Sequence, residues 1–297
     1  MNRNRTVFIL FLAVMSAGVA NVTVKSLLSD EDSKTGADLR SWVDFYTKVA
    51  SSHDFRTQDR PDESLKLEVK PVQQYAHPSG LRGTHGAFYV WTREGRPEVV
   101  GSIWSYEADA DHRTIVHEFD SLALSPLMQT RIAKGVWSQK RVIEPQLIPN
   151  APPPGETVRS RATQIKDLAQ RFEGYSMTNE TEIKLRMLPR PLYQFQAQTA
   201  KSNDCALFCF FADWDPEIVL LIESRETKLG PRWHYSAARF NICPMWLDYE
   251  EKRVWNVEKE PNTALTFGDP EGPFFAVHDV ASQPAKLKKS GLSPEEK

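Results

Sequence analysis

Residues 86–107, GAFYVWTREGRPEVVGSIWSYE, align without a gap with residues 205–226, CALFCFFADWDPEIVLLIESRE, 119 positions further along the chain. Seven of the 22 aligned positions are identical. The identical pairs are Ala87/Ala206, Pro97/Pro216, Glu98/Glu217, Val100/Val219, Ile103/Ile222, Ser105/Ser224 and Glu107/Glu226. Self-similarity at a fixed spacing is typical of a duplicated supersecondary unit. We therefore predict that the chain contains two copies of one structural unit.

The similarity extends beyond these two stretches in both directions. Upstream, residues 66–75 (KLEVKPVQQY) align with residues 184–193 (KLRMLPRPLY). Downstream, Leu122, Leu124, Pro126 and Leu127 align with Phe240, Ile242, Pro244 and Met245. The shared residues are apolar, proline or turn residues, so they describe a scaffold and identify no chemistry.

Each half is expected to contain one amphipathic helix followed by four strands. Apolar residues recur at helical spacing over residues 38–51 and again from residue 162 to Gly174, which would end the second helix. Strand-like runs follow at 65–75, 86–93, 98–106 and 114–124 in the first half, and at 182–193, 205–212, 217–224 and 233–243 in the second. The turn sequences 94–97 and 213–216 each join the second run to the third, as in a β-hairpin.

The predicted fold class is therefore α+β, with an internal duplication of a helix plus a four-stranded antiparallel meander. Residues 218–222 (IVLLI) are apolar at every position, which predicts burial on both faces of that strand. The two sheets are accordingly expected to pack together or to be continuous, with the helices outside. The order of elements resembles cystatin-like and NTF2-like rolls. This resemblance covers element order alone and implies no function.

The N-terminus has the pattern of an export signal. Arg3 and Arg5 precede an apolar run, and small residues up to Ala20 follow it. Residues 1–20 are therefore predicted to be a signal peptide, which places the protein in the periplasm or outside the cell. The alternative is an uncleaved N-terminal membrane anchor, for which the apolar run has marginal length.

The remaining boundaries follow from the repeat and from composition. They are a first repeat at 21–144, a Pro-rich linker at 145–158, a second repeat with an extra hairpin at 159–281 and a disordered tail at 282–297. The hairpin is expected over residues 246–257.

Charge and cysteine content limit the classes of partner and covalent structure. The formal net charge is −2, which argues against electrostatic binding to nucleic acid. There are three cysteines, and Cys205 and Cys209 lie too far apart along one strand to bond to each other. A bridge from either of them to Cys243 is open, and three reduced, buried thiols are the alternative. No cysteine or histidine spacing indicates zinc, and no cofactor motif is present.

The candidate chemistry lies where the two halves differ. In a meander, the loop between the first two strands and the loop between the last two emerge at the same end of the sheet. In the first half these loops carry histidines and aspartates that the second half lacks. The candidate metal ligands are His77, His85, Asp109, Asp111 and His112. The alternative reading of the same residues is a pair of solvated turns.

Two classes of function remain open. The first, which we favour, is a non-enzymatic exported protein that binds an envelope component or another protein, with no specific small molecule indicated. The second is a small exported hydrolase or metal-dependent enzyme that uses the His77/His85/His112 edge. A His117-Glu118 pair resembles part of a metalloprotease motif but lacks the second histidine, and on a strand the two side chains point to opposite faces.

Overall fold

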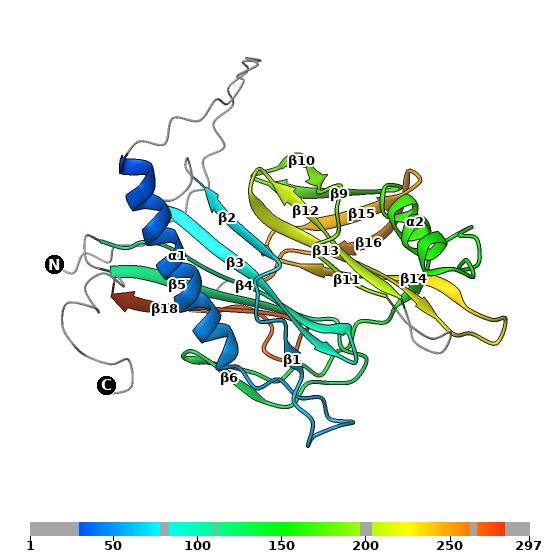
Figure 1. The fold of residues 1–297 in the computed structure, drawn as a ribbon, viewed down its shortest axis with the longest axis horizontal. Coiled ribbons are helices and arrows are strands. Elements are labelled where there is room, and N and C mark those ends of the chain that lie inside the picture. Colours follow the sequence, from blue (N-terminus) through cyan, green and yellow to red (C-terminus); the bar gives the residue numbers. More distant parts are fainter. Residues whose placement is uncertain (1–29, 78–82, 110–111, 197–203, 262–265, 283–297) are drawn as a thin grey trace, which may run out of the picture.

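The computed structural model describes residues 30–77, 83–109, 112–196, 204–261 and 266–282. These residues form two helices and 18 strands, and the strands pair antiparallel. The predicted α+β class was therefore wrong, because the described chain is mostly β-sheet and part of it curls into a half-barrel (Figure 1). Segments of the chain outside the two predicted meanders pair with the meander strands. Each sheet therefore has more strands than the four that were predicted.

The first sheet has the strand order β1-β3-β4-β5-β18-β17, and β2 also pairs with β3. Its strands are β1 Lys66–Leu67, β2 Gln73–His77, β3 Thr84–Arg93, β4 Arg96–Glu107, β5 His112–Ser121, β17 Thr266–Gly268 and β18 Phe274–Ser282. The C-terminal strand β18 pairs with β5 from His112 to Asp120. A segment from the end of the chain therefore completes the sheet built by the first half.

The second sheet has the order β16-β15-β9-β10-β12-β13-β14-β8, and β11 also pairs with β12. Its strands are β8 Gln146–Leu147, β9 Phe172–Thr178, β10 Thr181–Met187, β11 Tyr193–Phe195, β12 Cys205–Ala212, β13 Asp215–Arg225, β14 Arg232–Arg239, β15 Met245–Tyr249 and β16 Lys252–Val257. β15 and β16 form the hairpin expected at residues 246–257. β8 lies within the Pro-rich segment 145–158 and pairs with β14. A separate small hairpin consists of β6 Thr130–Ile132 and β7 Gly135–Trp137.

Helix α1, Asp30–Ser51, lies across the first sheet (Figure 1). Trp42, Tyr46 and Ala50 recur at helical spacing and are buried against a cluster that includes Tyr89 and Ile103. The helix begins eight residues before the predicted start at residue 38. One amphipathic stripe thus fixes α1 on the sheet.

Helix α2, Val158–Ala169, covers the second sheet with Ile165, Leu168 and Ala169. Thr157 caps its N-terminus, where the hydroxyl accepts a hydrogen bond from the Ser160 backbone. The prediction that Gly174 ends this helix was wrong, since Gly174 lies in β9. A Cβ atom there would come within 2.8 Å of the Phe210 ring. Close packing of β9 against that ring is therefore the role of this glycine.

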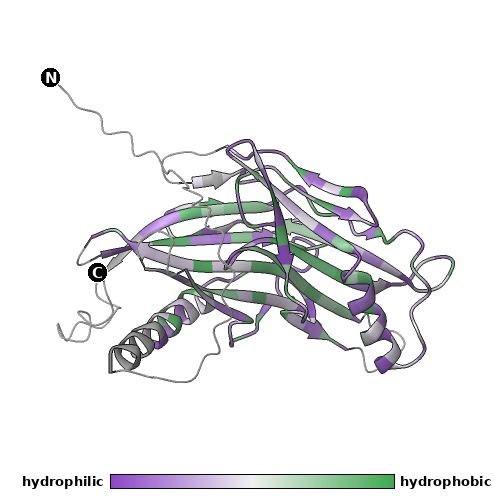
Figure 2. Ribbon diagram, turned by 90° about the horizontal axis from the view of Figure 1, so that it is seen from above, coloured by the Kyte–Doolittle hydropathy of each residue, from purple (hydrophilic) through white to green (hydrophobic). Residues whose placement is uncertain are grey.

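The inner faces of the two sheets pack against each other. Val219 and Leu221 join Phe88 and Val100 of the first sheet in one buried cluster. Ile218, Leu220 and Ile222 belong to a second cluster, on the side of the sheet covered by α2. Burial of residues 218–222 on both faces is thus confirmed. Figure 2 shows the strands hydrophobic along much of their length and the ends of several hairpins hydrophilic.

The hairpins β3–β4 and β12–β13 have the same register. Thr92 pairs with Pro97 after a bulge at Trp91/Thr92, and Phe211 pairs with Pro216 after a bulge at Phe210/Phe211. The predicted equivalence of Pro97 and Pro216 is confirmed. A proline next to a bulge lacks the N–H that a regular ladder would use, which explains its place at the start of each strand.

The upstream alignment was displaced by two residues. Val72 donates its backbone N–H to the carbonyl of Phe88, and Leu192 makes the equivalent bond to Leu207. Pro191, rather than Pro189, therefore corresponds to Pro71. The downstream alignment is confirmed, because Leu122 donates to the Glu98 carbonyl as Phe240 donates to that of Glu217.

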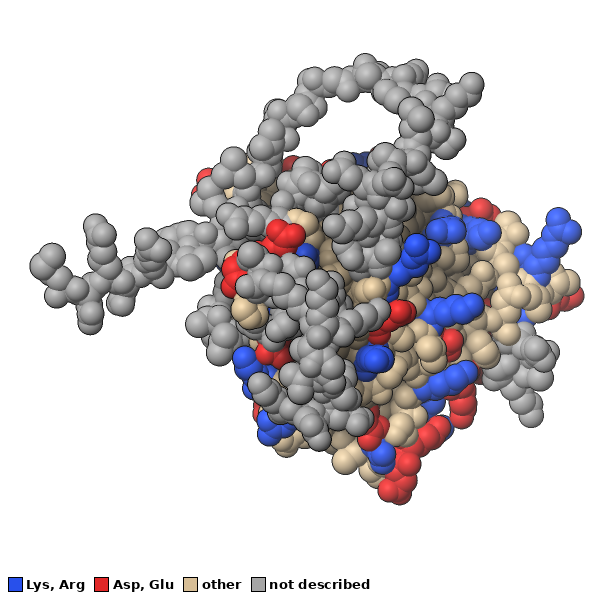
Figure 3. Space-filling view, turned by 60° about the vertical axis from the view of Figure 1, so that its left-hand side comes forward, with Lys and Arg blue, Asp and Glu red and all other residues tan. Residues whose placement is uncertain are grey.

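The predicted signal peptide and most of the predicted C-terminal tail lie outside the described residues. Among the residues that are described, no helix has the length and apolar character needed to cross a membrane. Figure 3 shows one face on which basic and acidic side chains are interspersed, in keeping with the small net charge. All three cysteines are free, and Cys205 and Cys209 are buried.

Candidate functional site

The predicted histidine edge is described only in part. His77 is the last residue of β2, and its backbone pairs with Thr84. Only the backbone of His77 is described, and Asp111 lies outside the described residues altogether. The side chains that can be placed are those of His85 in β3, Asp109 in the β4–β5 loop and His112 at the start of β5.

His85 faces α1 and takes part in a buried polar network. Its Nδ1 atom lies 2.9 Å from the hydroxyl of Tyr46, which is also hydrogen-bonded to Ser105. Arg113 donates from Nε to the same serine hydroxyl at 2.8 Å, and its guanidinium lies 5.4 Å from the Trp42 ring centroid. Burial, assisted by the positive charge of Arg113, lowers the pKa of His85 to about 3. His85 is thus neutral and engaged in the core.

His112 is exposed and forms a local turn interaction. Its Nδ1 atom lies 2.9 Å from Asp109 Oδ1, and its backbone N–H donates to the same oxygen at 2.9 Å. This pattern is that of an Asp-stabilised turn. Among the described residues, no group of three or more His, Cys, Asp or Glu side chains is placed to hold a metal ion.

The second half contains a counterpart of the His85 network. Asp204, 119 residues after His85, forms an ion pair with Arg161 of α2. Its carbonyl accepts the N–H of Ser224, the equivalent of Ser105. Each helix is thus fixed to its sheet by a polar contact at the same place. By analogy with Arg161 and Asp204 in the second half, Tyr46 and His85 anchor α1 to the first sheet.

A second polar cluster lies between the two sheets and was missed by the sequence analysis. It consists of Glu118 in β5 and of Asp215 and Glu217 in β13. Glu217 is only 5% exposed; its Oε1 accepts from Asn241 at 3.1 Å, whereas its Oε2 has no partner among the described residues. Glu118 and Asp215 are half-buried.

These three carboxyl groups share an unusual electrostatic environment. Burial raises the pKa of Asp215, and burial together with the charge of Asp215 raises the pKa values of Glu118 and Glu217 well above their usual range. The nearby Arg239 is already engaged, since it donates to the backbone carbonyls of Asn241 and Cys243, each at 2.7 Å. Each of these carboxyl groups therefore keeps its proton to a higher pH than an exposed carboxyl group does.

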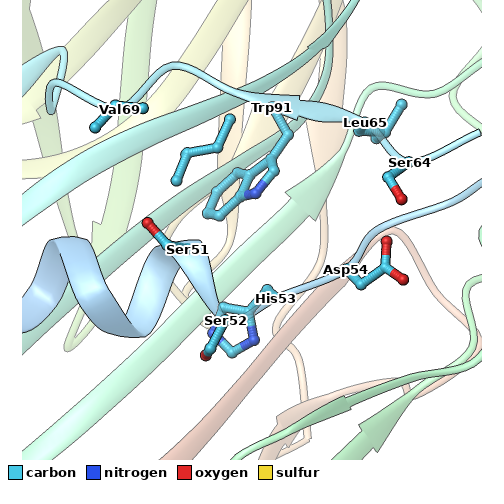
Figure 4. Close-up of a pocket in the computed structure, with 9 residues that line it drawn as sticks. Ser51, Ser52, His53, Asp54, Ser64, Leu65, Val69 and Trp91 are labelled. Atoms are coloured by element: carbon cyan, nitrogen blue, oxygen red, sulfur yellow. The ribbon is translucent and has the colours of Figure 1, made fainter.

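A hollow of about 320 Å³ lies at the C-terminal end of α1. Its lining residues are Ser51, Ser52, His53, Asp54, Ser64, Leu65, Leu67, Val69 and Trp91. Figure 4 shows the Trp91 indole reaching from its strand into the space between Val69 and the end of the helix, with His53 on the opposite side. One wall is thus apolar and the other is polar.

Two residues that line this hollow carry buried polar atoms. His53 Nε2 and Trp91 Nε1 are buried and have no hydrogen-bond partner among the described residues. Burial, with a contribution from nearby His117, lowers the pKa of His53 to about 4. Asp54 is paired with Arg56 at 2.9 Å, so it does not orient His53. These residues offer hydrogen-bonding groups to a ligand but do not form a Ser–His–Asp relay.

No protein-family model matches this sequence, and no curated protein or solved structure matches it. The function is therefore inferred from the chain's own geometry.

Proposed function

We propose that this protein is an exported, non-enzymatic binding protein whose ligand lies in the hollow at the C-terminal end of α1. The observation that carries the proposal is that two residues lining that hollow carry buried polar atoms, His53 Nε2 and Trp91 Nε1, that have no partner among the described residues. Buried polar groups are normally hydrogen-bonded, so a ligand that bonds to both would recover that energy.

The lining also indicates the character of the ligand. Leu65, Leu67 and Trp91 give an apolar surface, and the indole N–H can only donate. Neutral imidazole can accept or donate at Nε2 according to its tautomer. A small, partly apolar molecule with a hydrogen-bond acceptor fits this combination, and the volume lies at the lower end of the range for ligand pockets.

Export is supported by the sequence of residues 1–20, with Arg3 and Arg5 ahead of an apolar run. Intact-mass measurement on protein from the native host is expected to show a chain that begins after Ala20. Recovery of a soluble cytosolic form that retains Met1 would contradict export.

NMR spectroscopy of the full-length protein tests ligand binding. The probe is the pool of small organic molecules extracted from the host's envelope fraction. The Trp91 indole N–H and the His53 ring resonances are expected to shift. Trp233 is the matched control, because its indole nitrogen is also buried and unpartnered but does not line the hollow. Equal shifts at Trp233, or no shift at any site, would contradict the proposal.

Elemental analysis tests the enzyme alternative. A stoichiometric metal that is lost when His85 and His112 are replaced would overturn the non-enzymatic assignment. Arg96→Ala is unsuitable as a control because it breaks a buried ion pair. His278→Ala is the better control, since His278 lies outside the predicted set.

A further inference from the structure

The sheet interface has two ends that are related by the internal repeat. Arg96 and Glu98 of β4 correspond to Asp215 and Glu217 of β13, in each case 119 residues apart. By the same spacing, Trp104 corresponds to Glu223. The scaffold is therefore the same at both ends, and the side chains that occupy it differ.

At the first end, a guanidinium group lies between two carboxylates. Arg96 donates to Glu223 through Nε at 2.8 Å and Nη2 at 2.9 Å, and to Glu98 through Nη1 at 3.1 Å. It also donates to the carbonyls of Pro97 and Leu122 at 3.0 and 2.9 Å. Bidentate pairing of this kind is the strongest geometry available to arginine. At the first end, Arg96, Glu98 and Glu223 therefore each have a partner of opposite charge.

At the second end, the position of that arginine carries a carboxylate. Asp215 stands in the place of Arg96 and Glu217 in that of Glu98, and Glu118 adds a third acidic group from β5. Glu217 is only 5% exposed, yet its Oε2 atom has no hydrogen-bond partner among the described residues. Arg239 contributes positive charge but is held by backbone carbonyls and by Glu260 at 3.3 Å. The second end is rich in acceptors and poor in donors.

Aromatic side chains adjoin the acidic groups. Tyr75 is buried, and its hydroxyl forms a 2.6 Å hydrogen bond with the hydroxyl of Ser102. Burial and the charges of Asp215 and Glu118 raise the pKa of Tyr75. The half-buried Trp104 ring lies 5.9 Å from that of Tyr106. Carboxylates beside aromatic rings are the surroundings in which proteins hold flat organic cations.

We propose that Glu118, Asp215 and Glu217 bind a guanidinium group supplied by a ligand, in the manner in which Glu98 and Glu223 hold Arg96. A metal ion is a poorer occupant, because no three acidic, His or Cys side chains among those described converge on one point. A guanidinium group carries five N–H donors on a planar frame and so spans separated acceptors. This site is distinct from the hollow beside His53.

Isothermal titration calorimetry with N-acetyl-arginine methylamide tests the inference. The neutral isostere N-acetyl-citrulline methylamide is the matched control, because it has the same shape with a urea group in place of the guanidinium. The arginine compound is expected to bind at least about tenfold more tightly, since a charge-assisted contact is lost in the control. Agmatine, a free guanidino amine, distinguishes a small-molecule source from a peptide arginine.

Two variants make the test specific. Glu217→Gln keeps the acceptor for Asn241 and is expected to weaken binding at least about tenfold without unfolding the chain. Asp215→Arg places in the second end the residue found at the first, so it is expected to fill the site from within and abolish binding while the melting temperature is kept or raised. Glu226→Gln, on an exposed carboxylate, should change nothing.

Binding should also release protons, because the cation favours the ionised carboxylates. Titrations in two buffers of different ionisation enthalpy measure that release. Equal affinity for the citrulline compound, absence of binding to the folded wild-type protein, or unchanged binding by folded Glu217→Gln protein would each overturn the proposal.

Discussion

Arg96 and Asp215 are the first residues after the turns of two hairpins that share one register, and they carry opposite charges. Arg96 pairs across its hairpin with Arg93, and Asp215 pairs with Ala212. Arg96 forms an ion pair with Glu223 in the opposite sheet, whereas Asp215 lies near Glu118 and Glu217. Burial alone would raise the pKa of Glu223, but the hydrogen bonds and the positive charge of Arg96 lower it. One substitution between repeats thus reverses the electrostatics of an interface.

Leu221→Asp should destabilise the whole chain, because Leu221 is fully buried between the sheets. Burial of an unpaired charge is expected to cost about 4 kcal/mol. Leu229→Asp is the matched control, since Leu229 is 81% exposed, and it should change stability by less than about 0.5 kcal/mol. Urea unfolding followed by circular dichroism should show one transition. Two transitions, of which only one moves, would indicate autonomous halves.

Gly95→Ala should be more costly than Gly230→Ala, although both glycines have positive φ angles of 85° and 84°. A Cβ at Gly95 would lie 2.2 Å from the Phe195 ring, whereas one at Gly230 would meet nothing within 4 Å. The backbone strain is shared, at about 1 kcal/mol. The steric clash adds about 1–2 kcal/mol at Gly95 alone. Equal melting temperatures for the two variants would show that the Phe195 contact yields freely.

Glu217→Gln should change how stability depends on pH. The folded-state pKa of Glu217 lies above its unfolded value of 4.5, so the native state holds the proton longer and the free energy of unfolding falls as pH rises through that window. The variant should therefore match the wild type below pH 4 and become increasingly more stable than it as the pH rises above that value. Urea titrations across this range measure the difference, with Glu226→Gln as control. A constant offset at every pH would count against a raised pKa.

The three cysteines should react as free, protected thiols. Burial raises the pKa of Cys205 to about 12, and it also raises the pKa values of Cys209 and Cys243. Thiol titration without reductant is expected to find three groups per chain in denaturant. In the native state, reaction should be slow and should begin at the half-buried Cys243. A count of one thiol in denaturant would reveal a disulfide.

The hairpins could be predicted from sequence because turn residues and Pro97/Pro216 fix a local register. The upstream alignment failed by two residues because Pro189 and Pro191 both match Pro71, and only backbone hydrogen bonds select Pro191. The extra strands could not be found in this way, since β18 pairs with β5 across more than 150 residues of chain.

The candidate sites were harder to predict than the hairpins. Glu118 and Asp215 come together only when the two sheets pack face to face, which no local pattern encodes. The one available signal was the exchange of Arg96 for Asp215 within otherwise matched hairpins. His85 was predicted to lie in a solvent-facing loop. It lies in β3 instead, where the hydroxyl of Tyr46 on α1 contacts its ring, and the sequence did not predict this contact.

The pairing of β18 with β5 also bears on how the chain can be synthesised and moved. Phe275 and Val277 of β18 belong to the core of the first sheet. A nascent chain that ends before residue 274 lacks these side chains and leaves the backbone of β5 as an open edge. The first half therefore cannot acquire its final structure before strand β18 has left the ribosome. Under the export proposed above, a fold that closes this late leaves the chain unfolded for passage through a narrow channel.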